Sequence, residues 1–437
     1  MIDADQWPGG ARCKLVLCQR GAFSRALNPG GEHMASENRI LTTHVGSLVR
    51  PDDFTALLRR RMDGKVNDGE YLPALRGAVN KVAAEQVAAG VDVVSDGEYG
   101  KGIGWEQYVL ERLEGFGPRV VLATEGGVAF GDFARFPDFY AEMWTKENYL
   151  EGIFPCVGPI KYTGQAALKR DIDNLKTAMA AAGASAGFLP VAAPASAFSM
   201  SPNQYYKTDE EYVFAGAEAL RTEYKTITDA GLFVQIDDAH LPFTYDRMVP
   251  PATPKEFRKW ARIRVDALNH ALRGIPEDRV RYHICWGSWN GPHSSDVPLK
   301  EIADLILKVR AGAYSIEAAN ARHEHEWQVW KTIKLPQHKK LIPGVVSHQT
   351  NVVEHPELVA ERLLRFASVV GRDRVLAGTD CGFAQGPFVR RVHPSIQWAK
   401  LQSLAAGAHL ASKALWKRAA KKKKKTKPAK KARGKRR

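Results

Sequence analysis

The chain lacks any apolar run of about 20 residues, the length that a membrane-spanning helix needs. It has only five cysteines, and an odd, sparse number argues against a disulfide framework and for a reducing compartment. We therefore expect a cytoplasmic protein. The apolar patch at residues 15–18 is too short and too interrupted for a secretory signal. The hydrophobic share of 44% is ordinary for a soluble globular protein.

Acidic residues are absent from residues 417–437, which carry fourteen Lys or Arg. This tail accounts for almost all of the net charge of +15, so the body between residues 34 and 416 is close to neutral. A like-charged block cannot bury enough apolar surface to fold, which predicts a disordered basic tail. The tail could contact nucleic acid or anionic lipid through counterion release. The simpler interpretation, a solvated appendage, is the one we favour.

Sustained periodicity is also missing from the first 33 residues, which end at Met34. Met34 stands just before the first predicted strand and resembles a natural start. We therefore expect residues 1–37 to be a flexible N-terminal extension, with Met34 as a candidate true start. One folded domain is expected to follow at residues 38–416.

From residue 39 onward, short apolar runs alternate with longer amphipathic stretches, the pattern of parallel strands joined by helices. Strands are predicted at residues 40–45, 91–96, 188–194, 233–237, 281–285, 313–317, 341–347 and 374–379. Helices are predicted at residues 72–89, 209–230, 254–273, 298–311 and 356–370. Eight strands close an α/β TIM (β/α)8 barrel. Residues 102–186 are too long for one connection, so we expect extra elements between the second and third strands, including a hairpin around residues 154–162.

Polar side chains fall at or just beyond the carboxyl ends of these predicted strands. They are Ser47, Glu98, Asp237, Asp238, Cys285, Glu317, His348 and Cys381. In a TIM barrel the carboxyl ends meet at one mouth, which is where catalytic groups lie. The register therefore predicts a single site at that mouth.

Four of the residues near these ends have the chemistry of zinc ligands. His283 and Cys285 are two apart on one strand, so their side chains share a face. Two thiolates, an imidazole and a carboxylate select zinc over magnesium or calcium. Taken singly, each has a simpler interpretation: H-x-C is a weak signal, Cys381 could be a buried structural thiol and Glu317 a salt-bridge partner. Together, the four predict a zinc site.

The order H-x-C, S-I-E and D-C-G resembles the catalytic domain of the cobalamin-independent methionine synthase family. That family includes archaeal single-barrel forms and epoxyalkane:coenzyme M transferases. Further matches are TTHVGS at residues 42–47, DGE at 96–98, QIDD at 235–238, and PGV at 343–345 before His348. The similarity covers about residues 38–410.

The resemblance implies roles for particular residues. The residues that would bind zinc are His283, Cys285, Glu317 and Cys381. Those that would hold the amino and carboxylate groups of homocysteine are Ser47, Glu98 and Asp237, and His348 would supply a proton. The implied activity is a zinc-dependent methyltransferase that makes methionine without cobalamin bound to the chain. The donor would be of the 5-methyltetrahydrofolate type or a methyl-carrier protein.

The sequence departs from the family where substrate is expected to bind. The tryptophan on which the family stacks folate is missing from residues 194–206, where Phe198, Tyr205 or Tyr206 could offer another aromatic face. QIDD replaces QIDE, and no second barrel precedes the first strand.

Three alternatives therefore stay open. The first is the addition of a coenzyme M-type thiol to an epoxide, favoured if sulfonate-binding arginines line the mouth. The second, metal-assisted hydrolysis, is disfavoured because two thiolates reduce the Lewis acidity of a metal. The third is nucleic-acid binding through the basic tail.

Four other histidines have weaker signals. His323 and His325 could form a second metal site, although a solvated helix start is favoured. His44 either contacts substrate or caps a strand end, and His293 is expected to be a loop residue.

Overall fold

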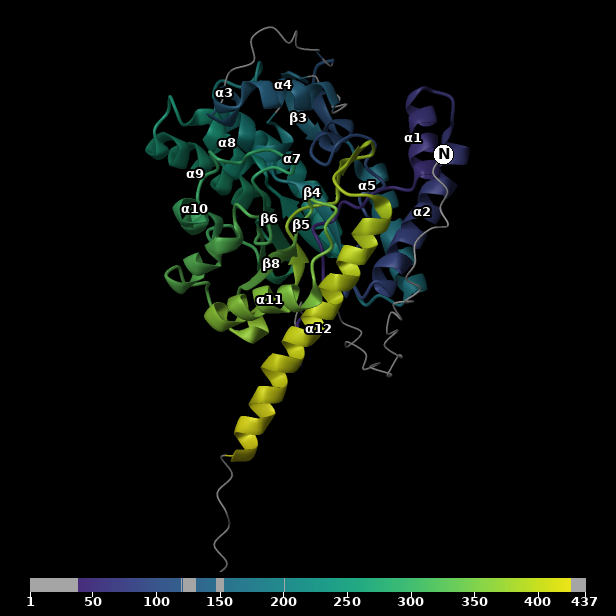
Figure 1. The fold of residues 1–437 in the computed structure, drawn as a ribbon. Helices are drawn as coiled ribbons and strands as arrows, with labels where there is room; N and C mark the ends of the chain where they lie inside the picture. Colours follow the sequence, from purple (N-terminus) through teal and green to yellow (C-terminus); the bar gives the residue numbers. More distant parts are fainter. Residues whose placement is uncertain (1–37, 119, 121–130, 147–152, 200, 426–437) are drawn as a thin grey trace, which may run out of the picture. The chain divides into compact units, whose positions relative to one another are not determined.

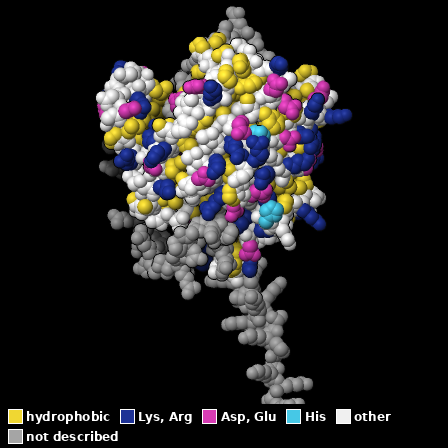
Figure 2. Space-filling view, turned by 180° about the vertical axis from the view of Figure 1, so that it is seen from behind, with side chains coloured by type: hydrophobic (Ala, Val, Ile, Leu, Met, Phe, Trp, Pro, Cys, Tyr) yellow, Lys and Arg dark blue, Asp and Glu magenta, His cyan; other side chains and the backbone are white. Residues whose placement is uncertain are grey.

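A computed structural model describes residues 38–118, 120, 131–146, 153–199 and 201–425, shown as a ribbon in Figure 1. The predicted N-terminal extension and Met34 lie outside the described residues. No helix in the described part of the chain is long and apolar enough to cross a membrane. Figure 2 shows acidic and basic side chains intermingled on one face of the described domain, in agreement with its near-neutral sequence.

Seven parallel strands form one curled sheet in the order β1-β4-β5-β6-β7-β8-β9. They are β1 (Val93–Ser95), β4 (Ala186–Ala192), β5 (Phe233–Asp237), β6 (Val280–Ile284), β7 (Ala313–Glu317), β8 (Lys340–Val346) and β9 (Gly378–Thr379). Nearly every residue of these strands is buried. Burial on both faces is what a parallel sheet covered by helices requires, and it explains the continuous apolar runs in the sequence.

The segment at residues 41–43 closes this sheet into a barrel. Leu41 O accepts a hydrogen bond from Ala377 N (2.8 Å), and Thr43 N donates to Ala377 O (2.9 Å). On the other side, Thr42 O accepts from Val93 N (3.1 Å). The segment therefore lies between β1 and the chain just before β9. The predicted TIM barrel is confirmed.

Two of the eight predicted strands are less regular than expected. The stretch at residues 40–45 forms only one isolated bridge, between Thr42 and Ala377. One reason is that Thr42 N donates to the side chain of Asp92 (2.9 Å) and not to a neighbouring backbone. The last predicted strand, residues 374–379, begins in the 3₁₀ turn η4 (Arg372–Arg374) and is reduced to β9.

The predicted helices are present, with small changes at their ends. They are α2 (Asp68–Ala88), α7 (Asp209–Asp229), α9 (Pro254–Ala271), α10 (Leu299–Ile306) and α11 (Pro356–Val370). Asn67, Thr208 and Thr253 cap three of them by accepting a backbone N–H in the first turn. Further helices are α1 (Asp52–Met62), α6 (Pro194–Ala197), α8 (His240–Met248) and α12 (Pro394–Lys425). The backbone of α12 enters the predicted basic tail, whose disorder and nucleic-acid binding stay predictions because residues 426–437 lie outside the described residues.

The long connection between β1 and β4 holds extra elements, as predicted. They are η1 (Gln107–Glu111), β2 (Leu113–Phe116), α3 (Gly131–Arg135), α4 (Pro137–Lys146), β3 (Cys156–Tyr162) and α5 (Gln165–Ala182). The expected local hairpin around residues 154–162 is wrong in its partner, because β3 pairs antiparallel with the distant β2. An alternating pattern reveals a strand but does not identify the strand with which it pairs.

Three shorter elements complete the described fold. A small antiparallel hairpin of β10 (Ala384–Gly386) and β11 (Val389–Arg390) follows β9 and leads into α12. The 3₁₀ turns η2 (Glu277–Arg279) and η3 (Glu324–Lys331) precede β6 and follow β7.

The closing contact of the barrel generates a stability prediction. Asp92→Ala removes the carboxylate that accepts from both Thr42 N and Thr42 Oγ1 (3.0 Å), and the buried N–H is left unpaired. We expect the free energy of unfolding to fall by about 1–3 kcal/mol. Urea denaturation followed by circular dichroism measures it. Asp173→Ala, which removes an exposed partner of Lys169, is the control and should cost less than about 0.5 kcal/mol. Equal losses in the two variants would refute the closing role.

Candidate active site

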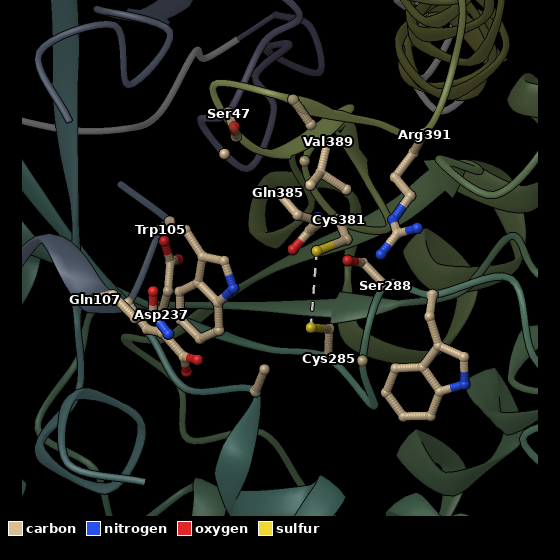
Figure 3. Close-up of a pocket in the computed structure, with 18 of the residues that line it drawn as sticks. Ser47, Trp105, Gln107, Asp237, Cys285, Ser288, Cys381, Gln385, Val389 and Arg391 are labelled. Atoms are coloured by element: carbon tan, nitrogen blue, oxygen red, sulfur yellow. Dashed lines mark hydrogen bonds between the residues drawn. The ribbon is translucent and has the colours of Figure 1, made fainter. Parts of the chain in front are cut away.

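A cavity of about 350 Å³ opens at the carboxyl ends of the barrel strands. Residues from the ends of several strands line it, together with residues of the β1–β4 connection, α8 and the β10–β11 hairpin. Six residues singled out in the sequence lie on its wall: Ser47, Glu98, Asp237, His283, Cys285 and Cys381. Figure 3 shows that the two cysteines face each other across part of this cavity.

The two cysteines and His283 form the core of the site. Cys285 follows β6 and Cys381 follows β9, yet their sulfur atoms lie only 3.7 Å apart. One ligand atom from each of the three residues lies within 4.8 Å of the others. All three side chains are buried. The barrel thus brings together residues separated by almost a hundred positions in the chain.

This donor set fits a zinc ion. Two sulfur atoms bound to one tetrahedral zinc at about 2.3 Å would lie about 3.8 Å apart, whereas a disulfide bond is about 2.0 Å long. The Nε2 atom of His283 is buried and has no hydrogen-bond partner among the described residues. Its Nδ1 atom lies 3.1 Å from Ser315 Oγ, an outer contact that orients the ring. The imidazole therefore presents an unused nitrogen toward the sulfur pair.

The electrostatics of the pair already favour a thiolate. The pKa of Cys381 lies well below its usual range, chiefly because of the hydrogen bond between the Cys381 and Cys285 side chains and also because His283 is close. The same hydrogen bond, together with burial, raises the pKa of Cys285 well above its usual range. Since the thiolate is the form of cysteine that binds metals, the pair is prepared for a soft cation.

Glu317, the fourth predicted ligand, lies beside this group without joining it. Its Oε1 atom accepts from Trp286 N (3.0 Å), and Oε2 accepts from Asn320 Nδ2 (2.5 Å). Burial raises the pKa of its carboxyl well above the usual range. Asp380 fixes the adjoining loop by accepting from the backbone of Ala318 (2.7 Å). The structure therefore gathers three of the four predicted ligands and holds the fourth at the end of β7.

The three predicted substrate residues lie on the same cavity wall. Glu98 has a left-handed backbone (φ 64°), which is strained for a residue with a side chain, and its carboxylate pairs with Lys101 at 2.7 Å. Burial raises the pKa of Asp237 to about 7, while Gln235 Nε2 donates to its Oδ1 atom (2.9 Å). Ser47 Oγ has no hydrogen-bond partner among the described residues. The wall thus offers two carboxylates and a hydroxyl to a polar ligand.

Comparison with known proteins identifies the family. Residues 194–396 match the family model described as "Cobalamin-independent synthase, Catalytic domain". The methionine synthase of Saccharolobus solfataricus is 26% identical over 372 residues, which cover 84% of this chain and 93% of that protein. The methionine synthase of Sulfolobus acidocaldarius is 25% identical, over 80% of this chain and 87% of that protein. The chain is thus similar to cobalamin-independent methionine synthases, in its sequence as a whole and in the catalytic-domain match over residues 194–396.

A solved structure has the same fold. The B12-independent methionine synthase from Shewanella sp. W3-18-1, in complex with selenomethionine, has a TM-score of 0.64 at 20% sequence identity. The match covers 86% of this chain and 99% of that one. This likeness bears on the fold alone, whereas the family model and the methionine synthase relatives support the predicted resemblance to the cobalamin-independent methionine synthase family and an enzyme of that kind.

His348, the acid that the family resemblance implies, is placed differently from the other site residues. It follows β8 and is fully buried, but it is not among the residues that line the cavity. Neither ring nitrogen has a hydrogen-bond partner among the described residues. Burial lowers its pKa to about 4. Its role as a proton donor stays a prediction.

Three of the other histidines noted in the sequence have internal partners. His44 Nε2 lies 2.7 Å from Gln86 Oε1, and its Nδ1 accepts from Gly46 N (3.1 Å), so it supports the first loop of the barrel. His293 and His323 each lie 3.1 Å from Asp296 Oδ2, and both are buried. His323 also pairs with Glu326 at 2.8 Å. A second metal site at His323 and His325 is not found among the described residues, where these contacts form an internal network.

Several residues of the site were not anticipated from the sequence of this family member. Aromatic walls come from Trp105, Phe133, Tyr140, Phe243, Trp289 and Phe388, and two arginines, Arg247 and Arg391, complete them. Many of these lie in the long β1–β4 connection and the β10–β11 hairpin, which have no barrel register to follow. His240 also lines the cavity. Unlike the residues above, it could have been found from the sequence, because it stands three residues beyond Asp237 of the QIDD motif.

Substitution of either cysteine tests the metal-binding group. Cys285→Ser or Cys381→Ser should lose most bound zinc, because serine is a poor ligand for a soft ion. Metal content after purification with added zinc, measured by plasma mass spectrometry, checks this, and circular dichroism checks the fold. Cys156→Ser is a matched control, since Cys156 is also a buried, free cysteine but lies on β3. Stoichiometric zinc in both site variants would refute the assignment.

Proposed function

We propose that the protein is a zinc-dependent methyltransferase that transfers a methyl group to the thiol of homocysteine and forms methionine. The proposal rests on one observation above all. His283, Cys285 and Cys381 lie close together on the wall of a cavity that is also lined by Ser47, Glu98 and Asp237. A group suited to binding a thiolate and groups suited to binding an amino acid thus share one chamber.

The residues that would hold zinc are His283, Cys285, Cys381 and, as a fourth and weaker ligand, Glu317. When bound, zinc would supply a Lewis acid that favours the thiolate form of the substrate sulfur. A free thiol with a pKa near 8.5 is mostly protonated at neutral pH, and only the thiolate is a strong nucleophile. Trp286 and Asn320 donate hydrogen bonds to the carboxylate of Glu317. These bonds hold the carboxylate beside the cluster of His283 and the two cysteines, but not as part of it.

The acceptor would be held by Ser47, Glu98 and Asp237 on the wall of the same cavity. An ammonium group would find the carboxylates of Asp237 and Glu98, and a carboxylate group would find the hydroxyl of Ser47. The raised pKa of Asp237 reflects burial without a full counter-charge. A ligand ammonium would supply that charge, so this residue gains more from an amino acid than an exposed carboxylate would.

The donor is proposed to be of the 5-methyltetrahydrofolate type or a methyl-carrier protein. Phe198, which was considered as a stacking face for folate, packs on Phe116 (ring centroids 5.8 Å apart) and is not among the residues that line the cavity. Tyr205 and Tyr206 are not on that wall either. Trp105 and Trp289 are on it, and either offers a broad aromatic face to a flat ring.

A second candidate function is favoured by the two arginines of the cavity. Arg247 lies over the ring of Phe243 (4.0 Å to the centroid), and Arg391 points into the cavity near Cys381, as Figure 3 shows. Guanidinium groups bind sulfonate and carboxylate oxygens well. A thiol with an anionic group, such as coenzyme M, could therefore replace homocysteine, with an epoxide as the carbon donor.

Zinc-edge X-ray absorption separates these functions. The zinc-loaded protein is measured alone, with homocysteine and with 2-mercaptoethanesulfonate. An added sulfur neighbour at about 2.3 Å with homocysteine would support the methyltransferase. An added sulfur neighbour with 2-mercaptoethanesulfonate but not with homocysteine would favour the second candidate. Zinc without any added sulfur would contradict both proposals.

Asp237→Asn tests how the acceptor is held. Loss of a charge-assisted contact costs about 1.5–3 kcal/mol, so the KM for homocysteine should rise about 10- to 100-fold. Zinc content should not change, because Asp237 is not a proposed ligand. Steady-state kinetics and metal analysis measure the two effects. Asp304→Asn is the control, since Asp304 pairs with Arg258 on the outer surface. An unchanged KM would contradict the assigned role.

A further inference from the structure

Lys101 is a buried cation beside the cavity, and the proposed function does not yet use it. Its side chain is 6% exposed, and lysine is seldom buried to this extent unless it is paired. Its Nζ atom lies 2.7 Å from Oε1 of Glu98, which is itself 3% exposed. The two residues therefore form a buried ion pair where the acceptor is proposed to bind.

Lys101 reaches Glu98 from the protein side of the cavity wall. Its Nζ atom lies over the ring of Tyr108, 4.3 Å from the centroid, and donates to the carbonyl oxygen of Trp105 (3.4 Å). Tyr108 is 1% exposed and belongs to the main hydrophobic core. Of the two residues in the ion pair, Glu98 is the one that lines the cavity. The ammonium of Lys101 therefore stands behind the carboxylate and leaves its cavity side to a ligand.

Other contacts hold the backbone around Glu98. Glu98 N donates to Asp96 Oδ1 (2.9 Å), and the Glu98 carbonyl oxygen accepts from Lys101 N (3.1 Å) and from the guanidinium of Arg50. Arg50 also donates to the carbonyl oxygen of Lys101 (3.1 Å). These contacts hold Glu98 in its left-handed conformation (φ 64°), which a residue with a side chain seldom adopts. Loss of the Lys101 side chain should therefore release the carboxylate of Glu98 but not the loop.

The charged groups around Glu98 match a single ligand cation. Burial raises the pKa of Asp237 to about 7, the charge of Glu98 adds to this rise and that of Lys101 opposes it, so the three groups are within electrostatic reach of one another. Neighbouring carboxylates disfavour each other's charged form, and a nearby cation offsets this effect. Two carboxylates and one lysine leave one negative charge, since Arg50 and Asp96, which contact the backbone of the same loop, add one charge of each sign. One ligand ammonium group would balance it.

We propose that Lys101 is a positioning residue that selects acceptors with an ammonium group, because it holds the charged carboxylate of Glu98 on the cavity wall. The inference rests on the proposed function, in which homocysteine is the acceptor. Lys101 does not touch the ligand but acts through Glu98, so its effect is confined to thiols that carry an ammonium group. A lysine with a structural role alone would affect all thiols equally.

Fragments of the acceptor test this role. The zinc-loaded protein is titrated by calorimetry with homocysteine, with 3-mercaptopropylamine, which lacks the carboxylate, and with 4-mercaptobutanoate, which lacks the ammonium group. The wild type is compared with Lys101→Met and Lys101→Arg. Lys339→Met is a matched control, because Lys339 is also buried (5% exposed) and pairs with Glu277, but it lies at the amino end of β8, away from the cavity.

We expect Lys101→Met to weaken the binding of homocysteine and of 3-mercaptopropylamine by about 10- to 100-fold, because a charge-assisted contact is lost. Binding of 4-mercaptobutanoate should stay within about threefold of the wild type, since it has no group that couples to Glu98. Lys101→Arg should retain most of the affinity for both amines. An equal loss for all three thiols, no loss at all, or a loss confined to the two thiols with a carboxylate would overturn the proposal.

A double variant shows whether Lys101 acts through Glu98. Glu98→Gln should weaken the binding of both amines, and adding Lys101→Met to it should have little further effect. The double variant leaves neither charge of the pair unmatched, so this comparison also holds where Lys101→Met alone does not fold. A further loss as large as that in the wild-type background would overturn the proposal. A zinc-loaded wild type that binds 4-mercaptobutanoate as tightly as homocysteine would instead refute the acceptor of the proposed function.

Discussion

The site depends on one constraint, which is that all parallel strands of a closed sheet must end on the same side. Strands β6 and β9 belong to distant parts of the chain, but the barrel brings the residues that follow them to one mouth. Closure is completed by the segment at residues 41–43, which joins the two edges of the sheet through backbone hydrogen bonds. That same segment leads directly to Ser47. The elements that close the barrel therefore also set the width of the cavity and the approach of the two sulfur atoms.

The barrel register made much of the architecture and part of the site predictable. Strands β5 and β7, which are buried on both faces, and helix α11, which is buried on one face, have the predicted bounds. Such burial leaves a clear apolar pattern in the sequence. The approach of Cys285 to Cys381 followed from register alone. The edge strands were less predictable, since a side chain of Asp92 replaces backbone pairing at Thr42. Glu317 shows a second limit: its place at the end of β7 was foreseeable, but the direction of its carboxylate depends on Trp286 and Asn320.

The walls of the cavity were not predictable for a different reason. Trp105, Phe133 and Tyr140 come from a connection whose strands pair across a long stretch of chain, so no periodic pattern marks which side chains face inward. The β10–β11 hairpin, which delivers Arg391, is also outside the barrel repeat. These parts of the cavity wall thus come from segments that lie outside the barrel repeat.

The charges around the cavity divide into groups with different tasks. The carboxylate of Glu98 pairs with Lys101, so its charge is largely neutralised within the protein. Asp237 is buried without an equivalent partner, and the raised pKa of its carboxyl shows the cost. A buried carboxyl group in that condition binds a cation more strongly than one that is already paired. The proposed binding of the acceptor and the proposed activation of its thiol therefore use separate groups on the wall of one cavity.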